Sequence, residues 1–315
     1  MTHRHYAHTL HAGQCHYGWD NALAPVQIVP PGETLLFHCK DASDGQITAT
    51  STSDCLARLD AARTNPVNGP VFIEGAMPGD ALKVTIGAFT PSGFGWTGII
   101  PGFGLLADQF PVPKLHLWHY DTKLNEPAAF SPYGRVPLMP FAGTIGVAPA
   151  EAGRHDIIPP RHVGGNMDMR ELRTGSILYL PVEVEGALFS IGDTHAAQGD
   201  GEVCGTAIES AMDVEITLDV VKGGAPRFPR LTTLSADPRH LDRNGAEVTT
   251  GIGPDLMAAA RDAVSGMIDL LCGSYGMAPE DAYMLVSVCA DLRLSEVVDA
   301  PNWVVSFHMP RSIFD

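Results

Sequence analysis

Alternating apolar and polar residues predict β-strands over most of the chain up to about residue 250. Residues 81–86 and 213–220 alternate with a period of two, the pattern of a strand with one buried face. Residues 176–180 and 187–191 are more continuously apolar, so we expect interior strands there. Turn sequences that contain glycine stand directly before several strands, at residues 30–33, 77–80 and 173–176. This repeated order of turn and strand predicts two or more β units packed together.

The pattern changes at Pro254, after which apolar residues recur at spacings of three and four. Over residues 256–271 this spacing predicts a helix with one apolar face. Pro254 suits the first turn of that helix, and Gly273 is placed to end it. We expect a second helix to begin at Pro279 and a final strand over residues 302–307.

These patterns predict a mainly β fold with a helical C-terminal portion (α+β), in which packed β-sheets form a sandwich-like body. We expect residues 1–250 to form a β-rich catalytic region. Residues 251–315 are predicted to add a helical hairpin and a final strand. Because no linker-like stretch separates the two parts, we interpret them as one integrated domain in which the helices cover one face of the β region.

The composition narrows the range of partners. The chain has 36 acidic and 20 basic residues, a formal net charge of -16, and 45% hydrophobic residues. Nucleic acids and anionic membranes are not expected partners, because both require clustered Lys and Arg. The sequence contains no apolar run long enough for a membrane span and begins without a secretory signal, which predicts a cytoplasmic protein. The six cysteines form no CxxC pair, so we expect reduced thiols.

The densest polar cluster follows an apolar strand, at residues 192–202. Asp193 and His195 are two residues apart and therefore project to the same side of an extended chain. A carboxylate beside an imidazole is half of a metal site. The small residues and glycines that follow allow Glu202 to return to the same point.

Two neighbouring features could extend this cluster. Residues 203–209 read as the next strand, on which Glu209 would point away from the side of Glu202 unless a bulge intervenes. Asn166 and Asp168 are again two apart, directly behind a glycine pair. An Asx turn, in which these side chains bond their own backbone, explains the second pair equally well.

Other segments are weaker candidates. His16 and Asp20 are close in sequence near the N-terminus, but histidine is common throughout this chain. The glycine- and aromatic-rich residues 91–113 could roof a small-molecule pocket with Trp96 and Phe103, or could be a surface loop whose aromatic rings only fill gaps. Nucleotide-binding, HExxH and GxSxG motifs are absent from the sequence.

Four stretches closely resemble the acetamidase/formamidase family. Residues 164–168 and 192–209 carry its motifs, and the second run is long enough to be highly specific. Residues 143–149 and 301–305 extend the resemblance over most of the chain. The resemblance implies hydrolysis of small aliphatic amides to a carboxylate and ammonia, a mostly β fold with a helical C-terminal portion, and a bound divalent metal.

Carried over by position, the resemblance implies Asp168, Asp193 and His195 as metal ligands and Glu202 as a further ligand or as the general base. We expect zinc, with calcium as the alternative, because calcium prefers an all-oxygen shell that His195 does not suit. A metal lowers the pKa of bound water and polarises the carbonyl, and Glu202 would then carry the proton to the leaving amine. Asn166 or the backbone amides of residues 164–165 would bind the oxyanion.

Several alternatives stay open at this point. Glu209 or Asp20 could be the general base in place of Glu202. An amidase could instead use Cys204 as nucleophile, although residues 193–209 contain no Lys or Arg to activate it. A non-catalytic β protein could use the same acids to bind calcium and a small molecule. As partners we expect a neutral small amide and further copies of the chain, in a homo-oligomer such as a dimer or trimer.

Overall fold

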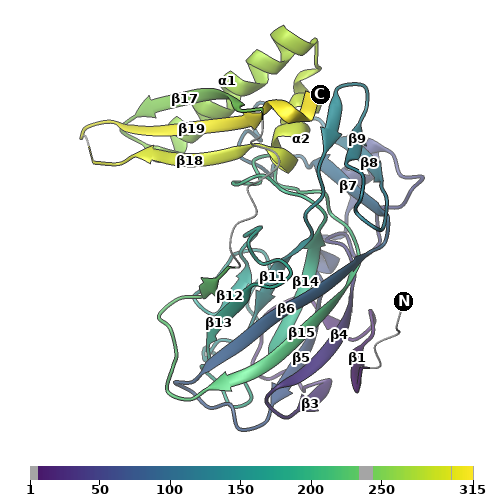
Figure 1. The fold of residues 1–315 in the computed structure, drawn as a ribbon, viewed down its shortest axis with the longest axis vertical. Helices are drawn as coiled ribbons and strands as arrows, with labels where there is room; N and C mark the ends of the chain where they lie inside the picture. The colour runs from purple at the N-terminus through teal and green to yellow at the C-terminus, as the bar shows by residue number, and fades with distance from the viewer. Residues whose placement is uncertain (1–5, 234–243, 299, 315) are drawn as a thin grey trace.

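Two β-sheets packed face to face form the larger part of the molecule, and a smaller unit of helices and strands lies at one end (Figure 1). This computed structural model describes residues 6–233, 244–298 and 300–314. The first sheet runs in the order β1 (His8–Leu10), β4 (Glu33–Cys39), β15 (Met212–Val221), β6 (Ala81–Pro91), β13 (Ile177–Pro181) and β16 (Arg230–Thr232). The second sheet runs in the order β12 (Gly164–Asn166), β11 (Phe141–Gly146), β14 (Phe189–His195), β5 (Val67–Ile73) and β2 (Cys15–His16), with β3 (Gln27–Val29) also paired to β5.

The strand positions follow from the sequence patterns. β15 alternates buried and half-buried residues because one of its faces lies on the core. β14 is buried along its whole length, and the apolar residues 187–191 that predicted an interior strand overlap its start. The rings of Phe37 on β4 and Phe189 on β14 meet edge to face with centroids 5.9 Å apart, which ties the two sheets together. The predicted sandwich-like, mainly β fold is confirmed.

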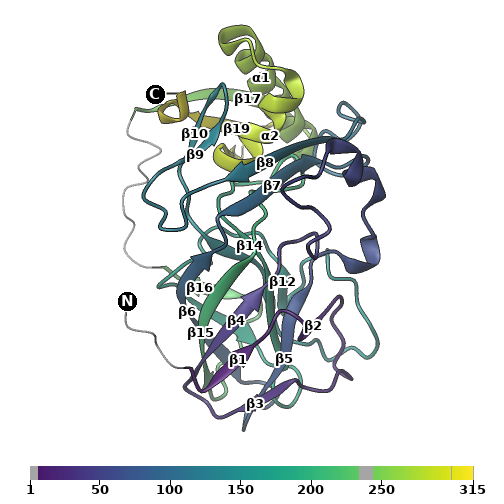
Figure 2. The ribbon, with the colours of Figure 1, turned by 90° about the vertical axis from the view of Figure 1, so that its right-hand side faces the viewer.

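The C-terminal unit is a three-stranded sheet covered by a helix. Its strands are β17 (Ala246–Gly253), β19 (Trp303–Pro310) and β18 (Asp291–Glu296), and its helices are α1 (Leu256–Tyr275) and α2 (Pro279–Cys289). α1 lies along β17 and β19, while α2 reaches β7 at the end of the sandwich (Figures 1 and 2). The sequence pattern predicted the helix pair but neither β17 nor β18. The expectation that both helices cover the large β region is wrong for α1, which covers this small sheet.

The first helix also ends later than predicted. Its N-cap is Asp255, whose carboxylate accepts a hydrogen bond from the Ala258 amide. The helix passes through Gly273 and ends at Gly276, which adopts the left-handed conformation (φ 62°) that closes a helix. None of the helices in the described ranges is long and apolar enough to cross a membrane.

Two hairpins and three short 3-10 helices complete the fold within the described residues. The segment expected as a loop over residues 91–113 contains β7 (Phe94–Ile99), which pairs with β8 (Lys114–His119). The other hairpin joins β9 (Ala128–Phe130) and β10 (Gly134–Val136), and the 3-10 helices are η1 (Ser53–Arg58), η2 (Ala61–Arg63) and η4 (Arg311–Phe314). η1 contacts the β7–β8 hairpin, so a segment from the N-terminal part of the chain packs beside this hairpin (Figure 2).

Candidate active site

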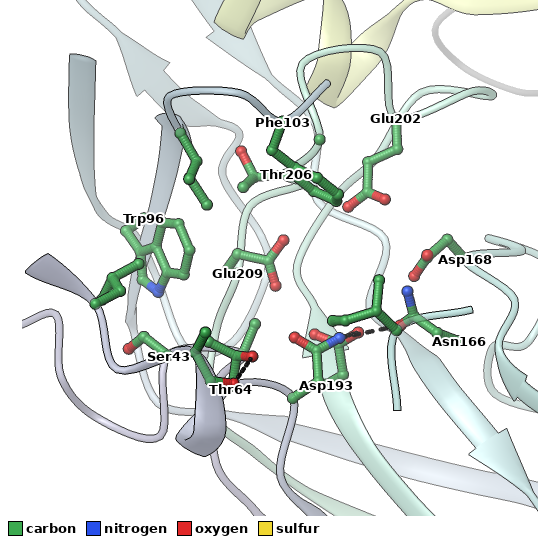
Figure 3. A pocket seen from close by; sticks show the side chains of 17 residues that line it. Ser43, Thr64, Trp96, Phe103, Asn166, Asp168, Asp193, Glu202, Thr206 and Glu209 are labelled. Carbon is green, nitrogen blue, oxygen red and sulfur yellow. Dashed lines mark hydrogen bonds between the residues drawn. The ribbon is translucent and has the colours of Figure 1, made fainter. Parts of the chain in front are cut away.

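A cavity of about 270 Å³ lies between the end of the sandwich and the β7–β8 hairpin. Its walls come from segments that are far apart in sequence, within residues 42–43, 59–65, 96–103, 158–168 and 193–209. In Figure 3 the carboxylates of Asp168, Asp193 and Glu202 lie toward one side, the Trp96 indole lies toward the other, and Glu209 lies between them. The fold thus brings both sequence motifs to one place.

Asp193 and His195 come from the end of β14, held between β11 and β5. His195 Nε2 lies 3.2 Å from Asp193 Oδ1, as the spacing of two residues predicted, and 3.1 Å from Glu209 Oε2. Burial alone would raise the pKa of Asp193, but His195 and further hydrogen bonds hold it below its ordinary value. Burial alone would lower the pKa of His195, but Glu209 and Asp193 raise it well above its ordinary value. The imidazole is therefore set deep in a field of negative charge.

Gln198 determines which nitrogen of His195 faces the carboxylates. The Gln198 Nε2 donates to the main-chain oxygen of Asp168 at 2.7 Å, so its Oε1 is left to accept from His195 Nδ1 at 2.9 Å. In the neutral form of the ring, Nδ1 therefore carries the proton, and Nε2 is left to give its lone pair to a cation. A histidine that donates its other N–H to an oxygen acceptor is typical of a metal ligand.

A short polar network supports Asp193 from the other side. Asn65 Nδ2 donates to Asp193 Oδ2 at 3.0 Å and to Asn166 Oδ1 at 3.1 Å. The Thr144 hydroxyl donates to Asn166 Oδ1 at 2.6 Å and lies 3.1 Å from Asp193 Oδ2. Because these donors occupy the Asn166 oxygen, its amide nitrogen is the group turned toward Asp168 in Figure 3.

Glu209 is positioned by main-chain pairing rather than by a regular strand. Residues 194–197 pair with residues 208–210, through Ser210 N to Thr194 O and Ala196 N to Ile208 O at 3.0 and 2.8 Å. This pairing aligns Glu209 with His195, and the residues between them form a loop. The predicted strand over residues 203–209 is wrong, because tight turns from Gly199 to Gly205 replace it. Those turns bring Glu202 and Glu209 to the same cavity.

The remaining carboxylates are held where ionisation is unfavourable. Burial and the nearby Asp193 raise the pKa of Asp168 to about 8. Burial, with Asp168 as the closest repelling charge, raises the pKa of Glu202 well above its ordinary value, and burial also raises that of Glu209. Asp168, Asp193 and Glu202 all adopt positive φ angles, of 50°, 52° and 43°. Such backbone is strained for residues other than glycine and collects at functional sites.

The residues present fit a divalent cation. Asp168, Asp193 and His195 form one group whose ligand atoms all lie within 4.8 Å of one another, and His195, Glu202 and Glu209 form a second. The buried Asp168 Oδ1 has no hydrogen-bond partner in the described part of the chain. Glu209 Oε2 likewise accepts no hydrogen bond there, although His195 Nε2 is 3.1 Å away. Oxygen atoms that lack a donor, next to an imidazole lone pair, are donors suited to a transition metal.

Two other sequence candidates lie outside this site. Both ring nitrogens of His16 are used in the fold, at 2.8 Å from Gly18 O and 2.8 Å from Ser190 Oγ. Asp20 accepts from the Ala22 amide at 2.9 Å in a turn. Neither residue lines the cavity, so the structure removes Asp20 from the candidates for general base.

Sequence reasoning missed several supporting residues. Thr144 and Gln198 lie inside stretches that resemble the family, so closer attention to those stretches could have found them. Asn65 carries no such signal, because its role depends on a left-handed backbone (φ 46°) and on contacts more than a hundred residues away. The pairing of Trp96 with Glu209 depends equally on the fold.

The fold and the site together define a β-sandwich enzyme with a buried, carboxylate-rich active site. The model of the Acetamidase/Formamidase family matches residues 4–156 and 150–315, so this chain belongs to that family. This confirms the predicted family and, with it, the predicted class of enzyme, an amidohydrolase.

Individual relatives agree with this assignment. The chain is 26% identical to a formamidase of Methylophilus methylotrophus, over 96% of this chain and 90% of the relative, and 28% identical to an acetamidase of Mycolicibacterium smegmatis, over 94% and 89%. Among solved structures, an acetamidase of Bacillus halodurans is 30% identical with a TM-score of 0.67, covering 96% of each chain. A gamma lactamase of Delftia acidovorans is 25% identical with a TM-score of 0.88, covering 98% of this chain and 94% of that one.

Proposed function

We propose that this chain hydrolyses neutral linear amides with a divalent cation, zinc in preference to calcium, held by Asp168, Asp193 and His195. The observation that carries the proposal is the environment of His195. Its Nδ1 donates to Gln198 while its Nε2 faces two carboxylates, beside an Asp168 oxygen without a donor. When bound, such a cation would polarise the amide carbonyl and lower the pKa of water.

Residues of the chain would carry out proton transfer and stabilise the tetrahedral intermediate. Glu202 lies across the cavity from Asp193, and a carboxyl group whose pKa is raised by burial can hold a proton and pass it to a substrate. It would take the proton from the attacking water and deliver it to the leaving nitrogen. The Asn166 amide nitrogen would donate to the oxygen of the tetrahedral intermediate. Glu209 stays the alternative base, because it lies on the same cavity.

Ammonia release and metal content test this proposal together. The purified protein, assayed with formamide, acetamide and propionamide, should release ammonia and contain about one divalent cation per chain. Asp193→Asn should lose the cation and lower kcat/KM by more than the roughly 10–100-fold expected for an outer-shell residue. Asp20→Asn is the matched control, since this carboxylate lies outside the site. Full turnover after complete metal removal, or an unchanged Asp193→Asn variant, would contradict the metal assignment.

The Cys204 nucleophile is not supported by the geometry. Cys204 is buried, and burial raises the pKa of its thiol. Its Sγ lies near backbone oxygens of Gly98 and Thr206, at 3.8 and 3.6 Å, and does not line the cavity. A thiol without a basic neighbour stays protonated and is a weak nucleophile. Cys204→Ala should therefore remain active, and its complete inactivation in a folded protein would restore the cysteine mechanism.

A cyclic amide is the second candidate substrate. The TM-score of 0.88 with the Delftia acidovorans gamma lactamase exceeds the 0.67 found with the Bacillus halodurans acetamidase. Ring opening of 2-pyrrolidinone, followed by the appearance of the amino acid product, tests this candidate. Turnover of the lactam above that of acetamide would favour it, and no ring opening would leave linear amides as the substrate class. The cytoplasmic location and the homo-oligomeric assembly remain predictions.

A further inference from the structure

The cavity is larger than a small amide requires. Its volume of about 270 Å³ equals the space of about nine water molecules at about 30 Å³ each. Formamide and acetamide would occupy only about two or three of those volumes. Asp168, Asp193 and Glu202 lie away from Trp96 in Figure 3, so the cavity leaves room near Trp96 for the rest of a larger substrate.

Apolar side chains make up part of the cavity lining. They come from three separate segments: Leu59, Trp96, Ile100, Phe103 and Ile158. Apolar walls with a small set of polar groups are typical of a site that binds an apolar part of its ligand. The sequence had suggested Trp96 and Phe103 as walls, and both line the cavity.

Trp96 is fixed in relation to the reacting groups. Its indole Nε1 donates to Asp41 Oδ1 at 3.0 Å, and the side chain is 2% exposed. Its main chain pairs directly with Glu209, through N to O distances of 2.9 and 2.8 Å in the two directions. This backbone pairing therefore fixes the position of the Trp96 main chain relative to that of Glu209. Moving the Trp96 main chain away from Glu209 would break both hydrogen bonds.

Phe103 is held over the loop that carries Glu202. A Cβ atom built on Gly205 would come 2.5 Å from the Phe103 ring, so the ring packs directly against the glycine backbone. The adjacent Leu105 amide donates to Val203 O at 2.9 Å, which ties this segment to the same loop. Phe103 is 45% exposed and therefore forms the outer rim of the apolar lining.

The apolar lining of the cavity selects against an anionic acyl group. Neither Lys nor Arg is among the described residues that line it. A carboxylate on the acyl group of a substrate would lie against apolar side chains, which cannot replace the water that it loses. An uncharged acyl group meets no such barrier.

We propose that Leu59, Trp96, Ile100, Phe103 and Ile158 form an acyl pocket, and that the preferred substrates are uncharged amides with a compact, branched or cyclic apolar acyl group. This inference rests on the proposed amide hydrolysis and names its substrate class. Each methylene group that the pocket buries should raise kcat/KM by about fourfold, the equivalent of about 0.8 kcal/mol. Isobutyramide has two more carbons than acetamide and should therefore exceed it by about 16-fold, and cyclohexanecarboxamide should exceed isobutyramide.

A substrate series with the metal-supplemented protein tests the acyl pocket. kcat/KM is measured for formamide, acetamide, isobutyramide, cyclohexanecarboxamide and succinamate, the last of which carries a carboxylate. Succinamate should be at least about tenfold poorer than isobutyramide. Ile158→Ala should lower the ratio of isobutyramide to acetamide by about tenfold, because the side chain of this pocket residue is lost. Val298→Ala, a change at a residue 80% exposed and outside the cavity, should keep the ratio of the wild type.

The outcomes distinguish failure of the acyl pocket from failure of the proposed amide hydrolysis. If acetamide is hydrolysed faster than every larger amide, the acyl pocket is wrong and the proposed function stands. If no amide in the series is hydrolysed, both are wrong. Should Ile158→Ala fail to fold, competitive inhibition of acetamide hydrolysis by cyclohexanecarboxamide in the wild type gives the same decision. Inhibition no stronger than that by formamide would overturn the acyl pocket.

Discussion

The two sides of the active site are built by different means. Asp193 and His195 sit on β14, a buried strand hydrogen-bonded on both sides within the sandwich. Glu202 sits on a loop over residues 198–207 that belongs to neither large sheet. Two of the three proposed cation ligands are thus part of a sheet, and the third, Asp168, lies just after β12. The proposed proton carrier depends on a loop that needs support from elsewhere.

The support for this loop comes from the C-terminal unit. The Gly199 amide donates to Ser287 O at 2.9 Å, the Cys204 amide donates to Ser287 Oγ at 3.1 Å, and the Tyr283 hydroxyl donates to Val203 O. Gly199 is required at its position, because a Cβ there would lie 1.8 Å from Ala290 O. None of the described residues of the C-terminal unit lines the cavity, yet this unit holds the loop in place. Changes in the sandwich should therefore affect the cation, and changes in the C-terminal unit should affect turnover.

The largest expected effect tests the loop side directly. Glu202→Gln keeps the size of the side chain but removes its ability to accept a proton. We expect kcat to fall by about 10²–10⁴-fold while the metal content stays unchanged. Metal analysis and steady-state kinetics on the same preparation measure both quantities. If Glu202→Gln loses the cation, Glu202 is a ligand and the division between the two sides is wrong.

The β-sandwich should lose stability at acidic pH because of His16. Burial is the main cause that lowers the pKa of His16 from 6.5 to about 4, so the folded protein keeps the ring neutral. Below pH 6.5 the unfolded chain binds the proton more readily, and stability falls as the pH drops from 6.5 toward 4. At pH 4.5 the loss should reach roughly 2–3 kcal/mol in the free energy of unfolding. Urea denaturation of the wild type and His16→Gln at pH 7 and 4.5 should show the smaller pH effect in the variant, and equal pH effects would contradict this.

Gln198 connects the two sides, since it belongs to the loop but bonds His195 and the backbone of Asp168. Gln198→Leu should weaken metal affinity by about 10–100-fold, because the ring of His195 loses the acceptor that orients it. Metal titration by calorimetry checks the change. Gln109→Leu, which removes a more exposed glutamine with a weak 3.4 Å contact, provides the control. Unchanged affinity in Gln198→Leu would show that other contacts orient the imidazole.

The smallest expected effect concerns the contact between α2 and the loop. Ser287→Ala removes the acceptor of the Cys204 amide and the hydroxyl that donates to Thr206 O at 2.8 Å. We expect kcat to fall by about tenfold and stability to fall by about 1–3 kcal/mol, because buried polar groups lose their partners. Metal content should remain that of the wild type. If Ser287→Ala loses metal but keeps its turnover per bound cation, the C-terminal unit supports the cation site and not the loop of Glu202.

Local patterns in the sequence were sufficient for much of the fold. The period-two strands over residues 81–86 and 213–220 lie inside β6 and β15, and the helical spacing after Pro254 lies inside α1. The strand predicted over residues 203–209 failed because tight turns run from Gly199 to Gly205, and only residues 208–210 pair with residues 194–197. Gly273 failed as a helix end because α1 continues along β17 and β19, whose packing outweighs a single glycine.

The sequence by itself determined the mainly β architecture and the acids and histidine of the two motifs, because periodicity and residue type are local properties. Only the tertiary structure decided that Glu209 faces His195 and that Asn65 supports Asp193. It also brought Trp96 to the same cavity and put α2 behind the loop of Glu202. These relations depend on main-chain pairings between distant segments, whose geometry no local pattern encodes. Short sequence motifs supply the reactive side chains of the site, whereas the fold determines the shape of the pocket and the support of the loop.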